Sequence, residues 1–302
     1  MGSIKYDPKE NTFYNADSNV ESILPQVIWH ITDRCFLSCP YCFATKTGRE
    51  TSLNHLNDYM EAFKKLGVLK IDIAGGEPLT YKNLNVICSE LYSNDIKMTI
   101  TTSGVGNENV KEWLIDNAKM FSWILISIDA PTPAQHDSLR GKVGTFSSLS
   151  KLIRELKNKG YNNIRINTLI TKKFLMSNIA EQFVELINEV KPLEWCLIQP
   201  HPANKKENYH LYATSESEFD KIVFNIKNLI KEKYTGFANI TLRYNSNYSK
   251  YWILYPDGKL KQHTEGSEDA FCFNFNKESV SEIEKFVKEY GVWLPMKEGD
   301  IY

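Results

Sequence analysis

The sequence contains no long run of apolar residues. Its longest runs, such as residues 123–126, are only a few residues long, whereas a membrane-spanning helix needs about 20. The first sixteen residues are polar and lack the apolar segment of a secretory signal. We therefore expect a cytoplasmic protein with no membrane partner.

An excess of charge of either sign is also missing. Lys and Arg number 36 against 37 Asp and Glu, which leaves a formal net charge of -1. Such a chain has no overall field to attract nucleic acid or an anionic membrane. Nucleic acid is therefore not an expected partner, and a polyanionic ligand has to be held by a local cluster of basic residues.

Cysteines are few, and their spacing is uneven. Six in 302 residues are too sparse for a disulfide-stabilised scaffold. Three of them, Cys35, Cys39 and Cys42, fall within eight positions. The other three are scattered along the chain: Cys88, Cys196 and Cys272.

The composition is that of a globular protein, with 42% hydrophobic and 24% charged residues. Short stretches rich in Ile, Leu, Val and Thr alternate with stretches of helical periodicity. The expected strands are 26–32, 70–74, 97–102, 123–128, 163–170 and 194–199. The expected helices are 53–66, 82–93, 109–120, 147–159, 178–190 and 216–233.

Six strand–helix units in series predict parallel strands joined by right-handed crossovers. The α/β fold is then either a doubly wound sheet or a partial (β/α)6 TIM-like barrel, with its ligand site at the carboxyl ends of the strands. We expect a polar N-terminal segment (1–25), the barrel (26–235) and a C-terminal α/β extension that caps the barrel (236–302).

The cysteine triplet directly follows the first expected strand. Three thiolates at spacings of four and three on a loop can converge on one metal centre. Structural zinc normally takes four protein ligands. A cubane iron–sulfur cluster also usually takes four cysteines, and three would leave one iron open to a small molecule. Both metals remain candidates at this point.

Two motifs together resemble the radical S-adenosylmethionine (SAM) superfamily. The first is Cys35-x-x-x-Cys39-x-aromatic-Cys42, and the second is Ala74-Gly75-Gly76-Glu77-Pro78 after the second strand. The resemblance implies a partial (β/α)6 barrel and a [4Fe–4S] cluster held by the three cysteines, with SAM on the fourth iron. It also implies reductive cleavage of SAM to a 5′-deoxyadenosyl radical, and hence an electron donor such as flavodoxin or ferredoxin.

The same resemblance implies further contacts to SAM. Gly75 and Gly76 allow the backbone to approach the SAM amino group closely, and Glu77 fixes the turn. Ser103 stands where Asn is frequent in the superfamily. The implied SAM-binding residues are Tyr41, Gly75, Gly76, Glu77, Pro78, Ser103, Ser127, Asp129, Arg140 and Asn167.

Within the superfamily, the chain most resembles viperin and the prokaryotic viperin-like enzymes. The segment 29–35, Trp-His-Ile-Thr-Asp-Arg-Cys, is similar to their Tyr-His-x-Thr-x-x-Cys entry. Those enzymes dehydrate nucleotides to 3′-deoxy-3′,4′-didehydro products. Cations at strand ends can hold phosphate there. The implied substrate-binding residues are His30, Lys70, Asp72, Arg165, Arg243 and Asn245.

The substrate remains open on the sequence alone. Cys196 follows Trp195 where viperin has a phosphate-binding Lys, so a nucleotide with fewer phosphates, or another polar molecule, is an alternative. A second alternative is a radical SAM enzyme that modifies a peptide without auxiliary clusters, since only Cys272 follows Cys196. A structural zinc protein is the third, and it leaves the motif at 74–78 unexplained.

Overall fold

The structure is a computed structural model that describes most of the chain. The described residues are 4–7, 12–15, 21–22, 24–42, 44, 46–175, 178–200, 209–245, 252–262, 272–275, 281–282 and 285.

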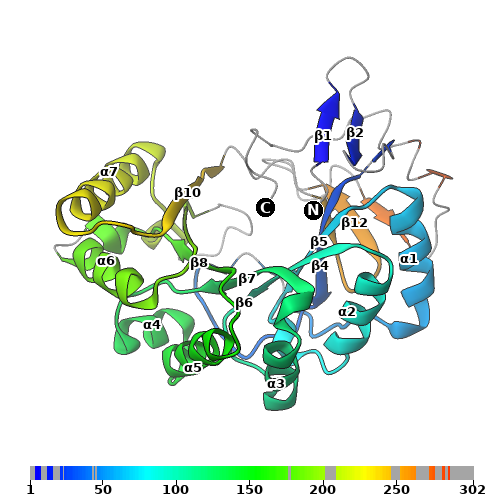
Figure 1. Ribbon diagram of the computed structural model, residues 1–302, viewed down its shortest axis with the longest axis horizontal. Helices are drawn as coiled ribbons and strands as arrows, with labels where there is room; N and C mark the ends of the chain where they lie inside the picture. The colour runs from blue at the N-terminus through cyan, green and yellow to red at the C-terminus, as the bar shows by residue number, and fades with distance from the viewer. Residues whose placement is uncertain are drawn as a thin grey trace.

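Six consecutive parallel strands form the centre of the molecule. Each pairs in parallel with the next along the chain, and the sheet curves without closing, as Figure 1 shows. The partial barrel expected from the sequence is therefore confirmed. The strands are β4 (Gln26–Thr32), β5 (Lys70–Gly75), β6 (Lys97–Thr102), β7 (Phe121–Ser127), β8 (Ile164–Leu169) and β9 (Glu194–Ile198).

The helices cover the outer, convex side of the sheet (Figure 1). This arrangement is that of a barrel, because a doubly wound sheet carries helices on both faces. The helices are α1 (Leu56–Lys65), α2 (Leu84–Ser93), α3 (Glu108–Asp116), α4 (Pro133–Arg140), α5 (Thr145–Asn158), α6 (Ile179–Val190) and α7 (Glu216–Lys233). Short 3₁₀ turns are η1 (Leu53–His55), η2 (Pro78–Thr80), η3 (Ala118–Met120), η4 (Lys172–Leu175) and η5 (Tyr209–Leu211).

Helix α4 was not expected, because its eight residues show no apolar period. It is defined by its ends instead. Thr132 caps the first turn by accepting the amide of Gln135, Pro133 stands at the first position, and Gly141 ends the helix at a φ of 69°. These local signals place the carboxyl end of α4 against the loop that carries the cysteines.

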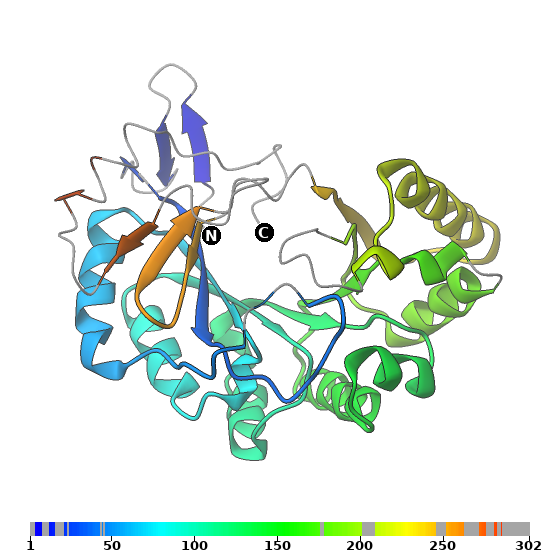
Figure 2. The same ribbon diagram turned by 180° about the vertical axis from the view of Figure 1, so that it is seen from behind.

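The described strands after residue 236 continue the central sheet at both edges. β10 (Asn239–Arg243) lies parallel to β9, and β11 (Trp252–Leu254) lies parallel to β4. β12 (Lys259–Gln262) lies antiparallel to β11, and β13 (Cys272–Asn274) lies antiparallel to β12, as seen in orange and brown in Figure 2.

The described residues of the N-terminal segment include three strands. Its strands β1 (Ile4–Asp7), β2 (Thr12–Asn15) and β3 (Glu21–Ser22) form a separate antiparallel sheet. No helix in the described part of the chain is both long and apolar enough to cross a membrane.

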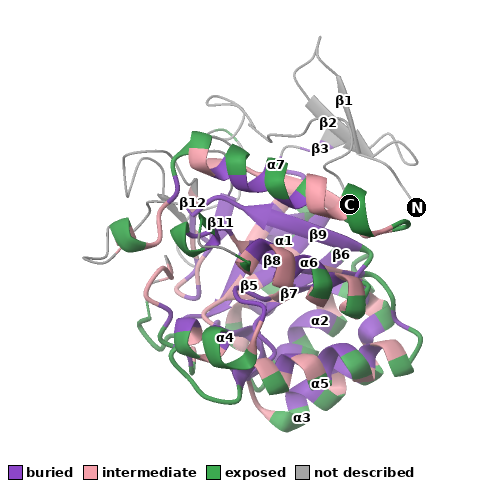
Figure 3. Ribbon diagram, turned by 90° about the vertical axis from the view of Figure 1, so that its left-hand side faces the viewer, coloured by how far each residue is buried: buried purple, intermediate pink, exposed green. Residues whose placement is uncertain are grey.

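The two faces of the central sheet differ in chemistry because side chains alternate along each strand. On β5, Ile71 and Ile73 are fully buried in the apolar core that the sheet shares with the helices, which appears as purple ribbon in Figure 3. The residues that alternate with them, Lys70, Asp72 and Ala74, belong to the concave side. The candidate site occupies this side.

Candidate active site

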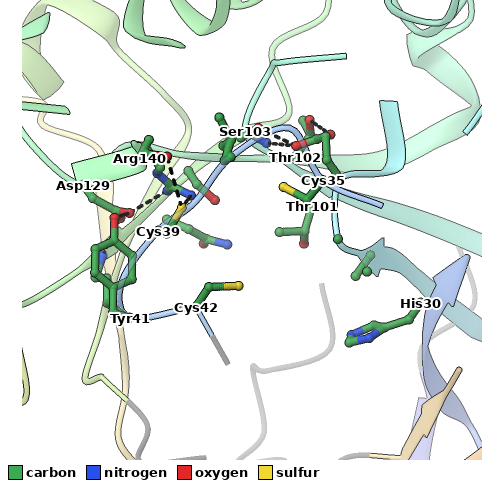
Figure 4. Close-up of a pocket in the computed structure, with 18 of the residues that line it drawn as sticks. His30, Cys35, Cys39, Tyr41, Cys42, Thr101, Thr102, Ser103, Asp129 and Arg140 are labelled. Atoms are coloured by element: carbon green, nitrogen blue, oxygen red, sulfur yellow. Dashed lines mark hydrogen bonds and ion pairs between the residues drawn. The ribbon is translucent and has the colours of Figure 1, made fainter. Parts of the chain in front are cut away.

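The concave side of the barrel encloses a cavity of about 270 Å³, which we call the barrel cavity. Most of the residues expected to bind a cofactor or substrate line it, and Figure 4 shows several of them. Those that line it are Cys35, Cys39, Tyr41, Cys42, Gly75, Gly76, Glu77, Ser103, Ser127, Asp129, Arg140, Asn167, His30, Asp72 and Arg243. Four expected residues are not among its lining: Pro78, Lys70, Arg165 and Asn245.

The cysteines lie on a loop that leaves and re-enters the barrel at one place. We call residues 33–50 the cysteine loop; positions 43 and 45 lie outside the described residues. The amide of Asp33 donates to the carbonyl of Arg49 at 2.8 Å, and the amide of Thr51 donates to that of Ile31 at 2.8 Å. These bonds close the neck of the loop, so its thiols are held over the cavity.

The donor set fits a cluster with three cysteine ligands. All three thiols line the barrel cavity beside open space. They are not close enough together to hold a single metal ion, and neither is any other group of three His, Cys, Asp or Glu side chains in the described residues. Burial raises the pKa of Cys35 to about 11, so metal binding has to displace its proton. Cys35, Cys39 and Cys42 would hold a [4Fe–4S] cluster here and leave one iron for SAM.

The Gly-Gly-Glu-Pro turn after β5 packs directly against the start of the cysteine loop. A Cβ on Gly75 would lie 2.2 Å from the carbonyl oxygen of Thr32, and one on Gly76 would lie 2.3 Å from that of Arg34. The amides of Gly76 and Glu77 donate to these same two carbonyls at 2.7 and 2.8 Å. Contact between two backbones is therefore a sufficient reason for both glycines, in addition to the close approach to SAM expected from the sequence.

Glu77 joins this turn to the next strand. Its buried carboxylate accepts hydrogen bonds from the Thr102 hydroxyl and from the amides of Leu79 and Ser103, at 3.1 and 2.7 Å. The Ser103 hydroxyl donates to it as well. Burial raises the pKa of Glu77, and these donors oppose the rise. Pro78 begins the buried turn η2 behind it, which explains why Pro78 does not reach the cavity.

Tyr41, Asp129 and Arg140 form one buried cluster (Figure 4). Asp129 Oδ2 accepts a hydrogen bond from the Tyr41 hydroxyl at 2.6 Å and pairs with Arg140 Nη2 at 2.6 Å. Its Oδ1 accepts from the amide of Leu169 at 3.1 Å. Burial, followed by the charge of Asp129, raises the pKa of Tyr41 well above its usual value. The cluster fixes the cysteine loop to the carboxyl ends of β7 and β8.

Arg140 also reaches a cysteine. Its Nη1 lies 3.9 Å from Cys39 Sγ, and its carbonyl accepts from the amide of Ser38 at 3.0 Å. Burial alone would lower the pKa of Arg140, but Asp129, Tyr41 and Cys39 outweigh it and leave the pKa above the usual value. The guanidinium is therefore a permanent cation next to one thiol, in a position to donate to a cysteine ligand.

Ionic side chains form the floor of the barrel beneath the cavity. Arg165 Nε lies 3.2 Å from Glu194 Oε1 and 3.0 Å from Asn167 Oδ1. Burial lowers the pKa of Lys70 to about 8; the Asp72 charge opposes this, and Arg165 and Arg243 add to it. Lys70 and Arg165 stand near the amino ends of their strands, which places them below the lining residues.

Asp72 lies above Lys70 on the same strand. It accepts hydrogen bonds from the hydroxyls of Thr99 at 2.9 Å and Thr101 at 3.3 Å. Its carboxylate is thus held in place at the wall of the cavity, where it can accept a hydrogen bond from a polar ligand.

His30 and Asn245 differ in their relation to the cavity. His30 lines it, with its ring 5.3 Å from that of Tyr255, and burial lowers its pKa to about 4, so it is neutral at pH 7. The amide of Asn245 donates to Gln199 Oε1 at 3.0 Å, outside the lining of the cavity. Asn245 therefore does not line the cavity, unlike His30, Asp72 and Arg243.

Sequence reasoning missed two groups of lining residues. Lys46 lines the cavity and donates to the carbonyl of Leu37, and its charge acts on Cys35. Thr101 and Thr102 line it from β6. Thr102 follows from strand alternation, since it stands at the carboxyl end of a predicted strand, whereas no sequence signal marks Lys46.

Replacement of Cys39 by Ala is expected to abolish cluster binding, because only two loop thiols remain. After anaerobic reconstitution, Cys39→Ala should lack the broad visible absorbance of a cluster and should form no 5′-deoxyadenosine from SAM. Cys88→Ala is the matched control: Cys88 is fully buried on α2, so its loss should lower stability only. A wild-type protein that binds zinc and never shows cluster absorbance would contradict the cluster assignment.

Gly76→Ala is expected to displace the cysteine loop, because the new Cβ meets the Arg34 carbonyl. Overpacking of this kind costs about 1–3 kcal/mol, and iron content after reconstitution should fall with it. Gly160→Ala is the control, since Gly160 has a φ of +77° with no atom within 4 Å of a Cβ. It should cost about 1 kcal/mol and leave iron content unchanged. Equal iron content in the two variants would refute the role given to Gly76.

Comparison with known proteins agrees with this geometry. The family model described as the radical SAM superfamily matches residues 29–187, which is just over half of the chain. A crystal structure of Streptococcus suis SuiB bound to precursor peptide SuiA superposes with a TM-score of 0.70 at 17% identity, covering 87% of this chain and 65% of that one. At this identity, the likeness shows a shared fold.

Curated relatives extend the comparison. An S-adenosylmethionine-dependent nucleotide dehydratase of Flammeovirga pacifica is 24% identical over 280 residues, which cover 85% of this chain and 93% of that protein. The chain spans 40% of a relative of the same name from Lacinutrix mariniflava, at 28% identity over 61% of this chain. A probable GTP 3′,8-cyclase of Archaeoglobus fulgidus is 25% identical, covering 83% of this chain and 80% of that protein.

The expected resemblance to the viperin-like enzymes is confirmed at the level of these names. The superfamily uses a [4Fe–4S] cluster and SAM, and another SuiB structure that shares this fold has SAM bound. The motifs, the open barrel and the matched residues lead to one conclusion: the chain belongs to the radical SAM superfamily and is an enzyme with those two cofactors.

Proposed function

We propose that this enzyme acts on a nucleotide and removes water from its ribose, giving a 3′-deoxy-3′,4′-didehydro product. The observation that carries the proposal is a group of three cations: Lys70 and Arg165 in the floor beneath the cavity, and Arg243 in the lining of the cavity. The names of the nucleotide dehydratase and GTP 3′,8-cyclase relatives support it.

The floor has the chemistry of a phosphate site. Arg165 and Arg243 both lie within electrostatic reach of Lys70. Two carboxylates lie near these cations: Asp72 above Lys70, and Glu194 beside Arg165. Glu194 forms an ion pair with Arg165 and accepts a hydrogen bond from the hydroxyl of Thr241 at 2.8 Å. Burial is the main cause of the lowered pKa of Lys70, and repulsion from Arg165 and Arg243 adds to it. An anion bound between the cations relieves this repulsion, which favours a phosphorylated ligand.

The height of the barrel matches a ligand that contacts the floor at one end and faces the cysteine loop at the other. Along β5, Lys70 marks the floor and Gly75 the level of the cysteine loop. Five residues of strand separate them by about 16 Å. A nucleotide whose phosphates contact the floor would therefore present its sugar midway, at the level of Asp72, and below the cysteines.

The residues at that middle level can hold a ribose. Asp72, held by two threonine hydroxyls, can accept a hydrogen bond from a sugar hydroxyl. The neutral ring of His30 can hydrogen-bond to the sugar without adding charge. When bound, the cluster and SAM supply a carbon-centred radical that takes a hydrogen atom from the substrate. The barrel's own task is to fix the sugar carbon that faces the cysteine loop, since position decides which hydrogen is taken.

A peptide substrate remains the alternative. Two solved structures of this fold are described as bound to peptides, but at 16–17% identity the likeness is one of fold. A peptide would leave the ionic floor of the barrel without a ligand, so the nucleotide is the better match to the cavity.

Incubation of the reconstituted enzyme with SAM, a reductant and each nucleoside mono-, di- and triphosphate tests the proposal. We expect a product that has lost water, seen by mass spectrometry, together with 5′-deoxyadenosine, from at least one nucleotide. Cys39→Ala, which should form neither product, is the negative control. SAM cleavage without conversion of any nucleotide would contradict the proposal and leave the family assignment intact.

Lys70→Met is expected to weaken nucleotide binding about tenfold to a hundredfold, the range for loss of one hydrogen bond to a charged group. In the wild type, the ammonium is present below pH 8 and lost as the pH rises through about 8, so affinity should fall on the alkaline side. In Lys70→Met this fall should disappear. Lys82→Met, at an exposed position, should keep both the affinity and the pH profile of the wild type; a variant Lys70→Met with an unchanged profile would exclude Lys70 from the site.

A further inference from the structure

Reductive chemistry in a buried cavity requires a path for electrons from outside. The cysteine loop is the wall between the barrel cavity and solvent, and its residues alternate in direction. Cys35, Leu37 and Cys39 line the cavity, whereas Phe36 is 52% exposed and Ser38 is exposed. At this point the wall is a single chain thick.

Phe36 is joined on its outer side to the corner between α4 and α5. The ammonium of Lys142 lies 5.0 Å from the centre of the Phe36 ring, and the next residue, Val143, is 91% exposed, the highest value among the exposed large hydrophobic side chains of the described chain. Gly141 contacts Ser38 so closely that a Cβ would lie 2.0 Å from the serine oxygen. Phe36, Lys142 and Val143 thus form one surface, which we call the loop–corner patch.

The patch presents exposed cations beside its apolar side chains. Lys142 is exposed, and the carboxylate of Asp137 on the same corner is directed to the amides of Gly144 at 2.6 Å and Phe146 at 2.8 Å. Within the loop, Arg34 keeps a half-exposed side chain and is only loosely paired with Glu50, at 3.7 Å. An aromatic ring and an aliphatic side chain beside exposed cations favour a protein partner with an acidic face.

We propose that the loop–corner patch is the docking surface for an acidic one-electron carrier protein. When the carrier docks, it is oxidised by one electron and the cluster held by Cys35, Cys39 and Cys42 is reduced by one; no bond forms or breaks and no proton moves. The small area of the patch suits a weak, transient complex, as is usual for electron-transfer pairs, and its charge steers the encounter. The proposal depends on the cofactors of the superfamily and not on the identity of the substrate.

Binding of a purified acidic flavodoxin to the holoenzyme tests the proposal, with the dissociation constant measured by calorimetry at two salt concentrations. Lys142→Glu and Val143→Glu should each weaken binding about tenfold at low salt. The Lys142→Glu effect should shrink at high salt, because exposed charges are screened. Phe36→Ala, normalised to cluster content, should weaken binding by a similar factor at both salt concentrations.

Matched controls lie on α7, far along the chain. Lys227→Glu reverses an exposed charge, and Phe224→Ala removes a ring that is 67% exposed; both should bind flavodoxin as the wild type does. SAM cleavage driven by dithionite should be equal in all variants, since a small reductant needs no docking surface. Wild-type protein that does not bind flavodoxin, or patch variants that bind as tightly as the α7 controls, would overturn the proposal. Failure to convert a nucleotide would not affect it.

Discussion

The shape of the active site depends on how the backbone of the cysteine loop is attached to the barrel. At its start, two carbonyls of the chain leaving β4 accept amides from the Gly-Gly-Glu-Pro turn. In its middle, the amide of Ser38 donates to the last residue of α4. At its end, Asp33 and Arg49 close the neck. A loop of this length would otherwise sample many conformations. These contacts leave its three thiols on one side, facing the cavity.

The second layer of support is ionic and lies behind the thiols. Asp129 connects Tyr41 of the loop with Arg140 of α4, while Glu77 connects the turn with the end of β6. Both carboxylates are almost fully buried and surrounded by donors, a condition under which a buried charge is tolerated. Three successive strand ends and one helix are thereby held in place around the cavity.

Strand and helix order could be predicted because the apolar period is strong in β4 to β9 and in most of the helices. The two motifs also predicted most of the lining of the cavity. Helix α4 and the N-terminal sheet were missed, since α4 buries only His136 and Leu139 and shows no period. The contact between Arg140 and Cys39 could not be foreseen, because it joins residues far apart in the chain through a helix that the sequence did not reveal. Lys70 and Arg165 were expected at strand ends, and the expected strands 70–74 and 163–170 place them at or near the amino ends, as the structure does.

The anchors of the cysteine loop have a consequence for divergence of the sequence. Backbone amides and carbonyls are supplied by every residue type except proline at the amide, so the loop can exchange most of its side chains between the cysteines and keep its path. The glycines at 75, 76 and 141 have no such freedom: a side chain at 75 would meet the last residue of β4, and one at 76 or 141 would meet the loop itself. The outward surface of the loop can therefore vary without disturbing the chemistry on its inner side.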